Sequence, residues 1–208
     1  MRRALKSSHL STPRTCVLAV AAAVTSLTIG SCASSPPMRY YTLTEVPATT
    51  RLTSADNAMP VRVDRVTIPE ELDRSQLVRR IDATRLQIVE AERWAAPLED
   101  TIRRVLSDNL TARLPPNMVA NPYEPSIGEK RQSLSVDIAE FYGDTTCAVT
   151  LRATWMLKLP EARSAHGAEE VRVPASGNCK DSTGLPAAMS QALAQLSDRI
   201  AAAVAHSP

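Results

Sequence analysis

Two segments of the chain have apolar residues at helical spacing. In the first, a single apolar face repeats at steps of three, four and one residues, and a proline pair ends it. Pro97 fits the first helical position of this segment, and the second segment begins near Pro186. The pattern predicts two amphipathic helices. Their apolar faces consist of Leu98, Ile102, Val105, Leu106, Leu110 and Leu114 in the first, and Met189, Leu193, Leu196, Ile200 and Val204 in the second.

Alternating apolar and polar residues predict strands in most of the remaining chain. The longest alternation covers residues 147–159, and a turn at Gly143 and Asp144 joins it to a shorter one at 134–138. A phase shift in the alternation between Val61 and Ile68 indicates a β-bulge. Further short strands are predicted at residues 40–44, 77–81, 86–89 and 171–173.

These elements together predict an α+β fold. We expect a single domain over residues 40–206, in which a mostly antiparallel β-sheet carries the two main amphipathic helices packed on one side.

The N-terminus has the organisation of a bacterial lipoprotein signal peptide. Four basic residues precede an uncharged, apolar stretch at residues 15–29, and the small residues Gly30 and Ser31 lead to Cys32. We therefore expect residues 1–31 to be a removed signal peptide, Cys32 to be the site of lipid attachment, and residues 32–39 to be a lipidated tether. Ala33, which is not acidic, favours the outer membrane, facing the periplasm. The alternative is an ordinary secretory signal in which Cys32 is a chance thiol.

Removal of the signal peptide changes the charge of the protein. It takes four of the 24 basic residues and no acidic ones, which leaves 20 Lys and Arg against 22 Asp and Glu. A nearly neutral mature domain without a basic run offers nucleic acid no electrostatic attraction. The low aromatic content of 3% also argues against surfaces that stack bases or sugars.

Two cysteines, Cys147 and Cys179, remain in the mature domain besides Cys32. In an oxidising periplasm we expect them to form a disulfide, although two buried, unpaired thiols are the alternative. A metal site is disfavoured, because His166 and His206 are the only histidines left and both fall in polar or terminal segments.

Several segments, in their order along the chain, resemble the PqiC-type ABC-transport auxiliary lipoproteins. The most specific is Trp94-Ala95-Ala96-Pro97-Leu98, directly before an amphipathic helix. The other segments are Tyr40-Tyr41-Thr42-Leu43, Val61-Arg62-Val63 to Ile68-Pro69, Leu106 and Asn109-Leu110 to Leu114-Pro115, and Ser135-Val136-Asp137 to Phe141-Tyr142-Gly143.

The resemblance implies an outer-membrane lipoprotein that docks an MCE-domain protein spanning the periplasm. Such a system would move lipids between membranes and support envelope integrity. Whether the chain forms a homo-oligomer is left open. The alternative is a periplasmic lipoprotein that itself carries a lipid or another apolar ligand between its sheet and its helices.

The chain offers no motif of an enzyme. A nucleophile elbow, a P-loop and an H-E-x-x-H motif are all missing from the sequence, so we expect neither catalysis nor a cofactor. Trp155 is expected in the core, and His166 in an exposed loop between strands. Tyr40, Tyr41 and Trp94 are candidates for contact with a partner, although Trp94 could instead staple the helix to the sheet.

Overall fold

The computed structural model describes residues 37–52, 59–121, 123, 130–159, 164–177 and 182–206. Residues Met38–Pro208 form one compact unit. Its elements are β1 (Arg39–Tyr41), β2 (Val61–Thr67), the short 3-10 helix η1 (Glu70–Leu72), β3 (Gln76–Arg80), β4 (Leu86–Trp94), α2 (Leu98–Arg113), β5 (Gln132–Gly143), β6 (Ala148–Lys158), β7 (Ser164–Pro174) and α3 (Leu185–Ala205).

The described strands form one seven-stranded sheet in the order β1-β4-β3-β5-β6-β7, and β2 pairs with β5 off this path. One side of the sheet is the antiparallel meander of β5, β6 and β7, which together with β4 are the longest strands. β2 runs alongside the first half of β5, and β3 meets the other end of β5 at the pair Arg79 and Gly143. The two ends of β5 therefore have different strand partners, β2 at one end and β3 at the other.

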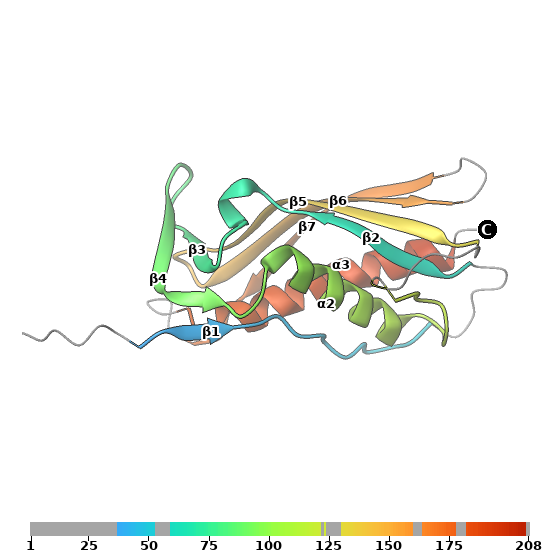
Figure 1. Cartoon of the computed structure of the whole chain (residues 1–208), viewed down its shortest axis with the longest axis horizontal. Coiled ribbons are helices and arrows are strands. Elements are labelled where there is room, and N and C mark those ends of the chain that lie inside the picture. Colours follow the sequence, from blue (N-terminus) through green and yellow to red (C-terminus); the bar gives the residue numbers. More distant parts are fainter. Residues whose placement is uncertain are drawn as a thin grey trace, which may run out of the picture. The chain divides into compact units, whose positions relative to one another are not determined.

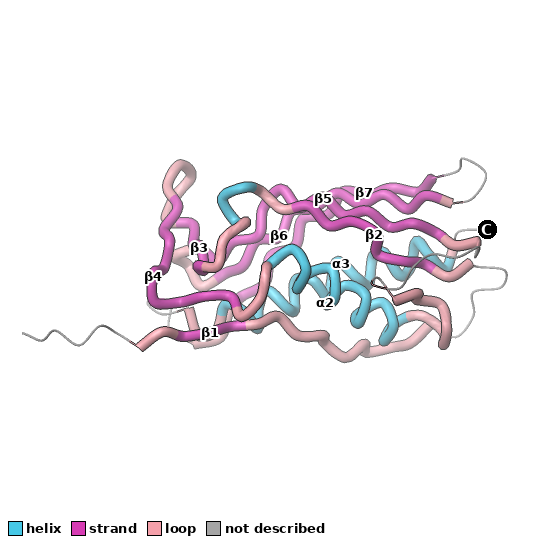
Figure 2. Tube along the Cα trace, in the orientation of Figure 1, coloured by secondary structure: helices cyan, strands magenta, loops and turns pink. Residues whose placement is uncertain are grey.

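Both helices lie on one face of this sheet (Figures 1 and 2), where α3 packs on β5, β6 and β7 and α2 packs on β2. The predicted α+β fold with two helices on one side is thus confirmed. The sheet is mixed, however, because β1 is parallel to β4 and β2 is parallel to β5. A parallel pair needs a crossover connection, and the chain from β2 to β5 passes through β3, β4 and α2 before it returns.

The phase shift predicted in β2 is a real irregularity of its ladder. Val63 pairs with Leu134, and the next pair joins Arg65 to Ser135, so that Asp64 is the extra residue. The bulge keeps Val63 and Val66 buried and leaves Arg65 exposed. Arg65 thereby joins the side chains on the face of the sheet opposite the helices.

The first helix begins one residue later than the sequence predicts. Pro97 is the N-cap and Leu98 the first helical residue, and the Pro97 carbonyl accepts a hydrogen bond from the Thr101 N–H at 3.0 Å. The predicted apolar face of α2 is buried throughout. In α3, Gly184 occupies the N-cap and Pro186 lies in the first turn. Proline is tolerated there because the N–H that it lacks would have no partner within the helix.

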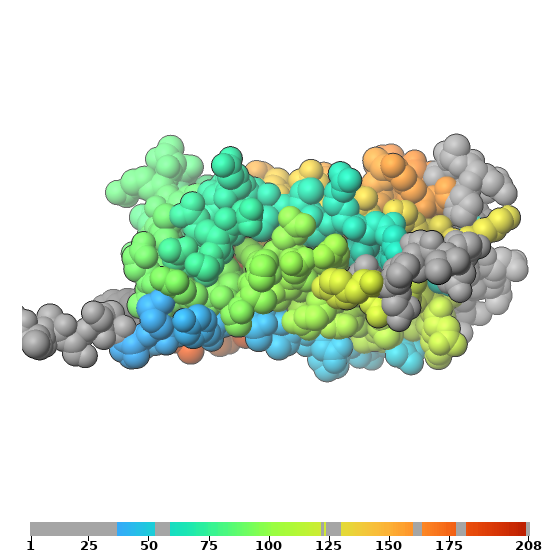
Figure 3. Space-filling view, viewed as in Figure 1, coloured from blue at the N-terminus to red at the C-terminus, as the bar shows by residue number. Residues whose placement is uncertain are grey.

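The segment that follows β1 is hydrogen-bonded to both helices. The Val46 N–H donates to the Asn109 side chain of α2 at 2.9 Å, and the Thr44 N–H donates to the Ser190 hydroxyl of α3 at 3.1 Å. Further along, the Leu52 N–H donates to the carbonyl of Arg113 at 2.8 Å. Figure 3 shows this blue segment along the edge of the domain beside α2. It closes the helical layer on the side away from the sheet.

Candidate functional site

The face of the sheet that the helices leave open carries a line of polar side chains. Along β6 the core-facing residues alternate with exposed ones, of which Met156 and Lys158 are examples. Because paired residues of neighbouring strands point to the same face, Ser135 of β5 and His166 of β7 lie beside Met156. The open face is therefore built from three neighbouring strands of the meander and from β2.

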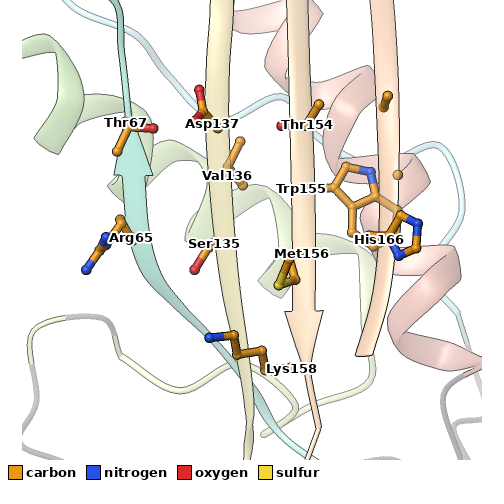
Figure 4. Close-up of a pocket in the computed structure, with 12 residues that line it drawn as sticks. Arg65, Thr67, Ser135, Val136, Asp137, Thr154, Trp155, Met156, Lys158 and His166 are labelled. Carbon is orange, nitrogen blue, oxygen red and sulfur yellow. The ribbon is translucent and has the colours of Figure 1, made fainter. Parts of the chain in front are cut away.

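A shallow depression of about 530 Å³ lies in this open face (Figure 4). Three basic side chains line it, Arg65 from β2, Lys158 from β6 and His166 from β7, whereas Asp137 is the acidic one. Its other lining residues are Thr67, Ser135, Val136, Thr154, Trp155, Met156, Gly167 and Ala168. We name this region the basic depression.

Arg65 and Lys158 of the depression are not neutralised by neighbours in the described structure. Among the described residues, neither Arg65 nor Lys158 has a carboxylate within 4.0 Å, although Arg62 nearby forms an ion pair with Asp64. Met156, which pairs with Ser135 in the same depression, adds an apolar side chain that is 43% exposed. The depression can thus offer both positive charge and apolar area to a bound surface.

The other half of the open face is internally paired. Glu140 of β5 forms ion pairs with Arg152 of β6 and with Arg80 of β3, the latter at 3.8 Å. The guanidinium of Arg80 lies 4.7 Å from the centre of the Tyr142 ring, and the Tyr142 hydroxyl donates to Glu71 of η1 at 2.6 Å. Because these charges already have partners, this half has less to offer a binding partner than the basic depression.

Two pKa shifts accompany this paired half. Burial raises the pKa of Tyr142, and the hydrogen bond that its hydroxyl donates to Glu71 acts in the same direction. That hydrogen bond is also the main reason why the pKa of Glu71 lies below its ordinary value. At neutral pH the pair is therefore a neutral phenol donating to an ionised carboxylate, which holds η1 on the sheet.

Trp155 belongs to the core, as predicted, and it accounts for a glycine in β7. Only 7% of Trp155 is exposed, and it pairs with Gly167 across β6 and β7. A Cβ placed on Gly167 would lie 2.6 Å from two carbons of the indole ring. The indole thus occupies the space that a side chain at position 167 would need.

We expect Gly167→Ala to lower the free energy of unfolding by about 1–3 kcal/mol, because a rigid buried ring cannot move away from the new methyl group. Urea denaturation measures this loss. Ala168→Ser, at the adjacent exposed position, is the control and should change stability by no more than about 0.5 kcal/mol. Equal stability of both variants would contradict the packing described here.

The structure places the three predicted contact residues differently. Tyr40 is 65% exposed, whereas Tyr41 is half-buried and Trp94 is 6% exposed. Tyr41 and Trp94 are paired in the ladder of β1 and β4, and both belong to or pack against the core. The burial of Trp94 fits a packing role between sheet and helix, and Tyr40 is the member of the set that a partner could reach.

Of the three cysteines predicted to have a role, the structure describes Cys147. Cys147 is disulfide-bonded, and it lies in the turn before β6 with a φ of 58°. Cys32 and Cys179 lie outside the described residues, so lipid attachment and the pairing of Cys147 with Cys179 stay predictions. The chain just before Cys179 does run beside Cys147, whose carbonyl accepts a hydrogen bond from the Ala175 N–H at 2.7 Å.

The turn that carries Cys147 is ordered by Asp144. Burial alone would raise the pKa of Asp144, but hydrogen bonds from the Thr146 hydroxyl and from the N–H groups of Thr146 and Ala148 outweigh it and hold the pKa below its ordinary value. Arg172 of β7 adds an ion pair at 2.7 Å. The position of Cys147 is thus fixed from both sides of the turn.

The prediction that His166 lies in a loop is wrong, because β7 is much longer than its two valines indicate. β7 begins at Ser164, and His166 pairs with Met156 inside it. Small residues and glutamates in the first half of β7 conceal the strand in the sequence. Arg65 and Lys158 were not predicted as site residues. The sequence marks them only by their positions between buried residues in two alternating segments.

Within the described residues, no three His, Cys, Asp or Glu side chains are grouped so that they could hold a metal ion. No helix in that part of the chain is long and apolar enough to cross a bilayer.

Comparison with known proteins links residues 41–201 to a family described as the ABC-type transport auxiliary lipoprotein component. The intermembrane transport lipoprotein PqiC of Escherichia coli (strain K12) is 28% identical over 135 residues, which cover 64% of this chain and 71% of that protein. PqiC of Shigella flexneri is similar to the same extent.

Solved structures show the same fold. The crystal structure of an uncharacterized protein matches with a TM-score of 0.68 and 21% identity, covering 81% of this chain and 99% of that one. The crystal structure of a Xanthomonas campestris protein matches with a TM-score of 0.59 and 18% identity, covering 80% of this chain and 93% of that one.

Proposed function

The chain belongs to the family of ABC-type transport auxiliary lipoprotein components, and from this premise we propose that it docks an MCE-domain protein of an intermembrane lipid transport system. In this proposal the protein is anchored in the outer membrane through acyl chains on Cys32, faces the periplasm and supports envelope integrity. The family is one of transport auxiliaries and not of enzymes, and its relatives in Escherichia coli and Shigella flexneri are named as intermembrane transport lipoproteins.

The short tether supports a docking role. From Cys32 to Tyr40 an extended chain spans at most about 25–30 Å, so an anchored domain stays close to its own membrane. Transport between two membranes then requires a second protein that bridges the periplasm, and an anchored docking subunit gives that protein a fixed end point.

The filled core is the observation that favours docking over a carrier function. A carrier would need an apolar cavity between the sheet and the helices. This space is instead occupied by side chains with no exposed area, which pack from both layers. They include Ile102, Leu106 and Leu110 of α2, Leu134 of β5, Leu157 of β6, and Leu193 and Leu196 of α3.

Within this proposal, the basic depression is the surface that meets the partner. Arg65 and Lys158 are exposed and have no carboxylate within 4.0 Å in the described part of the chain, so their charge is available to acidic side chains on another protein. Met156 in the same depression supplies apolar contact area. The depression also lies toward the end of the meander away from β3 and β4, and therefore away from the strand at which the tether enters.

The test is a crosslinked pull-down of the lipidated protein from envelopes, with mass spectrometry of bound proteins and lipids. We expect an MCE-domain protein to be enriched, and Arg65→Glu or Lys158→Glu to reduce its capture about tenfold, the effect of about 1.4 kcal/mol. Arg199→Glu is the matched control, because Arg199 is also an exposed arginine with no carboxylate within 4.0 Å among the described residues, but it lies on α3.

Equal capture by Arg65→Glu, Lys158→Glu and Arg199→Glu would show that the basic depression is not the docking surface. Bound lipid without any MCE-domain protein would contradict docking itself and favour the carrier function.

A further inference from the structure

We propose that the end of the domain formed by β1 and the β3–β4 hairpin rests on the lipid bilayer, with Leu86 and Ile88 in the membrane interface. This inference rests on the proposed function in one respect, because it takes Cys32 as the lipid anchor. We name Met38 and Tyr40 of the β1 region, together with Leu86 and Ile88 of β4, the apolar end.

The distribution of exposed apolar side chains identifies this end. Six large apolar side chains are exposed among the described residues, and four of them belong to the apolar end. Of the other two, Tyr123 is covered on one ring face by Arg103 at 5.2 Å, and Met156 lies in the basic depression. Exposed apolar residues that gather in one place, and are not scattered, mark a contact surface.

The four side chains lie at the same end of the domain. Tyr40 pairs with Arg93 in the parallel ladder of β1 and β4, and Ile88 lies five residues earlier on β4, at most about 17 Å away along the strand. Figures 1 and 3 show β1 and the β3–β4 hairpin together at this end. Since β1 pairs with only three residues of β4, the stretch from Leu86 to Val89 has β3 as its one strand partner in the described structure.

The length of the tether indicates that a bilayer is what contacts the apolar end. Met38 is six residues after Cys32, so an extended chain allows at most about 20 Å between them. The anchor therefore holds the apolar end close to the membrane whether or not a partner is present. A surface that is kept permanently near lipid, and that exposes aliphatic and tyrosine side chains, has the composition of an interfacial contact.

The charges at this end are compatible with such a contact. At the hairpin turn, Arg85 forms an ion pair with Asp82 at 2.5 Å, and Arg39 pairs with Glu92 at 3.7 Å. Paired charges do not repel the anionic lipids that bacterial membranes contain. The acyl chains supply the binding energy, and the apolar end sets the orientation of the domain on the surface.

The experiment uses the mature lipoprotein with its acyl chains, reconstituted without other proteins in vesicles of phosphatidylethanolamine and phosphatidylglycerol. A polarity-sensitive NBD fluorophore is attached to Ile88→Cys or, as the control, to Met156→Cys, and nitroxide-labelled phospholipids are added as quenchers. The two positions are matched, because Ile88 is 41% and Met156 43% exposed. Circular dichroism verifies that both variants are folded.

We expect the fluorophore at position 88 to emit at shorter wavelength and to be quenched several-fold more strongly than the one at position 156. Equal emission and equal quenching at the two positions would overturn the inference. So would shielding of position 88 that appears only with rising protein concentration or after a periplasmic partner is added, because a second copy or that partner would then be the occupant.

The outcome is separable from that of the docking proposal. Strong quenching at position 88 supports the membrane contact even if no MCE-domain protein is captured from envelopes. Weak quenching at position 88, in a protein that still captures such a partner, overturns the membrane contact and leaves the docking function in place.

Discussion

Replacing the predicted lipidation site, Cys32→Ser, is expected to release the protein from its membrane and to abolish its contribution to envelope function. A thioether to diacylglycerol can form at Cys32 only through its sulfur. Each buried methylene of an acyl chain contributes about 0.8 kcal/mol, and a single chain gives only marginal binding, so the loss of all chains removes the anchoring energy completely. Membrane fractionation and the detergent sensitivity of a strain carrying only the variant measure the two effects.

Two controls make this result specific. The Cys32→Ser domain should unfold at the same urea concentration as the wild type, because residue 32 precedes the compact unit that begins at Met38. Ala33→Asp keeps the anchor but supplies the acidic residue that usually retains lipoproteins in the inner membrane, so it tests the choice of membrane separately. Full envelope function from a soluble Cys32→Ser protein would refute the anchoring proposal.

Loss of the predicted disulfide is expected to have the largest effect on stability. A bond between Cys147 and Cys179 closes a loop of about 32 residues, for which the chain-entropy model gives roughly 3–4 kcal/mol. We expect Cys179→Ser, or reduction of the wild type with dithiothreitol, to lower the free energy of unfolding by this amount. Urea denaturation with and without the reductant gives the measurement.

We expect the domain to stay folded when this disulfide is reduced. Cys147 precedes β6, in a turn that Asp144 and Arg172 hold in place independently of the sulfur. The control is a protein in which both cysteines are serine, since its unfolding should not respond to dithiothreitol. An unchanged midpoint of the wild type on reduction would show that these cysteines do not stabilise the domain.

The helices and the longest strand could be predicted because their signals are local. The apolar face of α2 repeats within one segment of the chain, and β6 alternates without interruption from Val149 to Leu157. The parallel pairings of β1 and β2 could not be predicted in this way. Their partners lie far away in the sequence, and the alternation of a strand is the same whichever strand is its neighbour and whichever way it runs.

The difference between local and non-local signals also applies to the candidate site residues. Cys32 is marked by residues directly beside it, so the sequence alone leads to the prediction that it carries the lipid. The basic depression has no such mark, because Lys158 and Arg152 occupy equivalent outward positions on the same strand. What distinguishes them is that Glu140 lies beside Arg152 across the ladder, whereas no carboxylate lies within 4.0 Å of Lys158 in the described structure.

The hydrogen bonds that join the segment after β1 to both helices have a mechanical consequence for an anchored domain. Any pull exerted by a partner and resisted by the acyl chains enters the fold at Met38, and it first loads the ladder between β1 and β4. Behind this ladder, the hydrogen bonds from Thr44 and Val46 to Ser190 and Asn109 pass the load to α3 and α2 together. Tension on the anchor is therefore shared between the sheet and both helices.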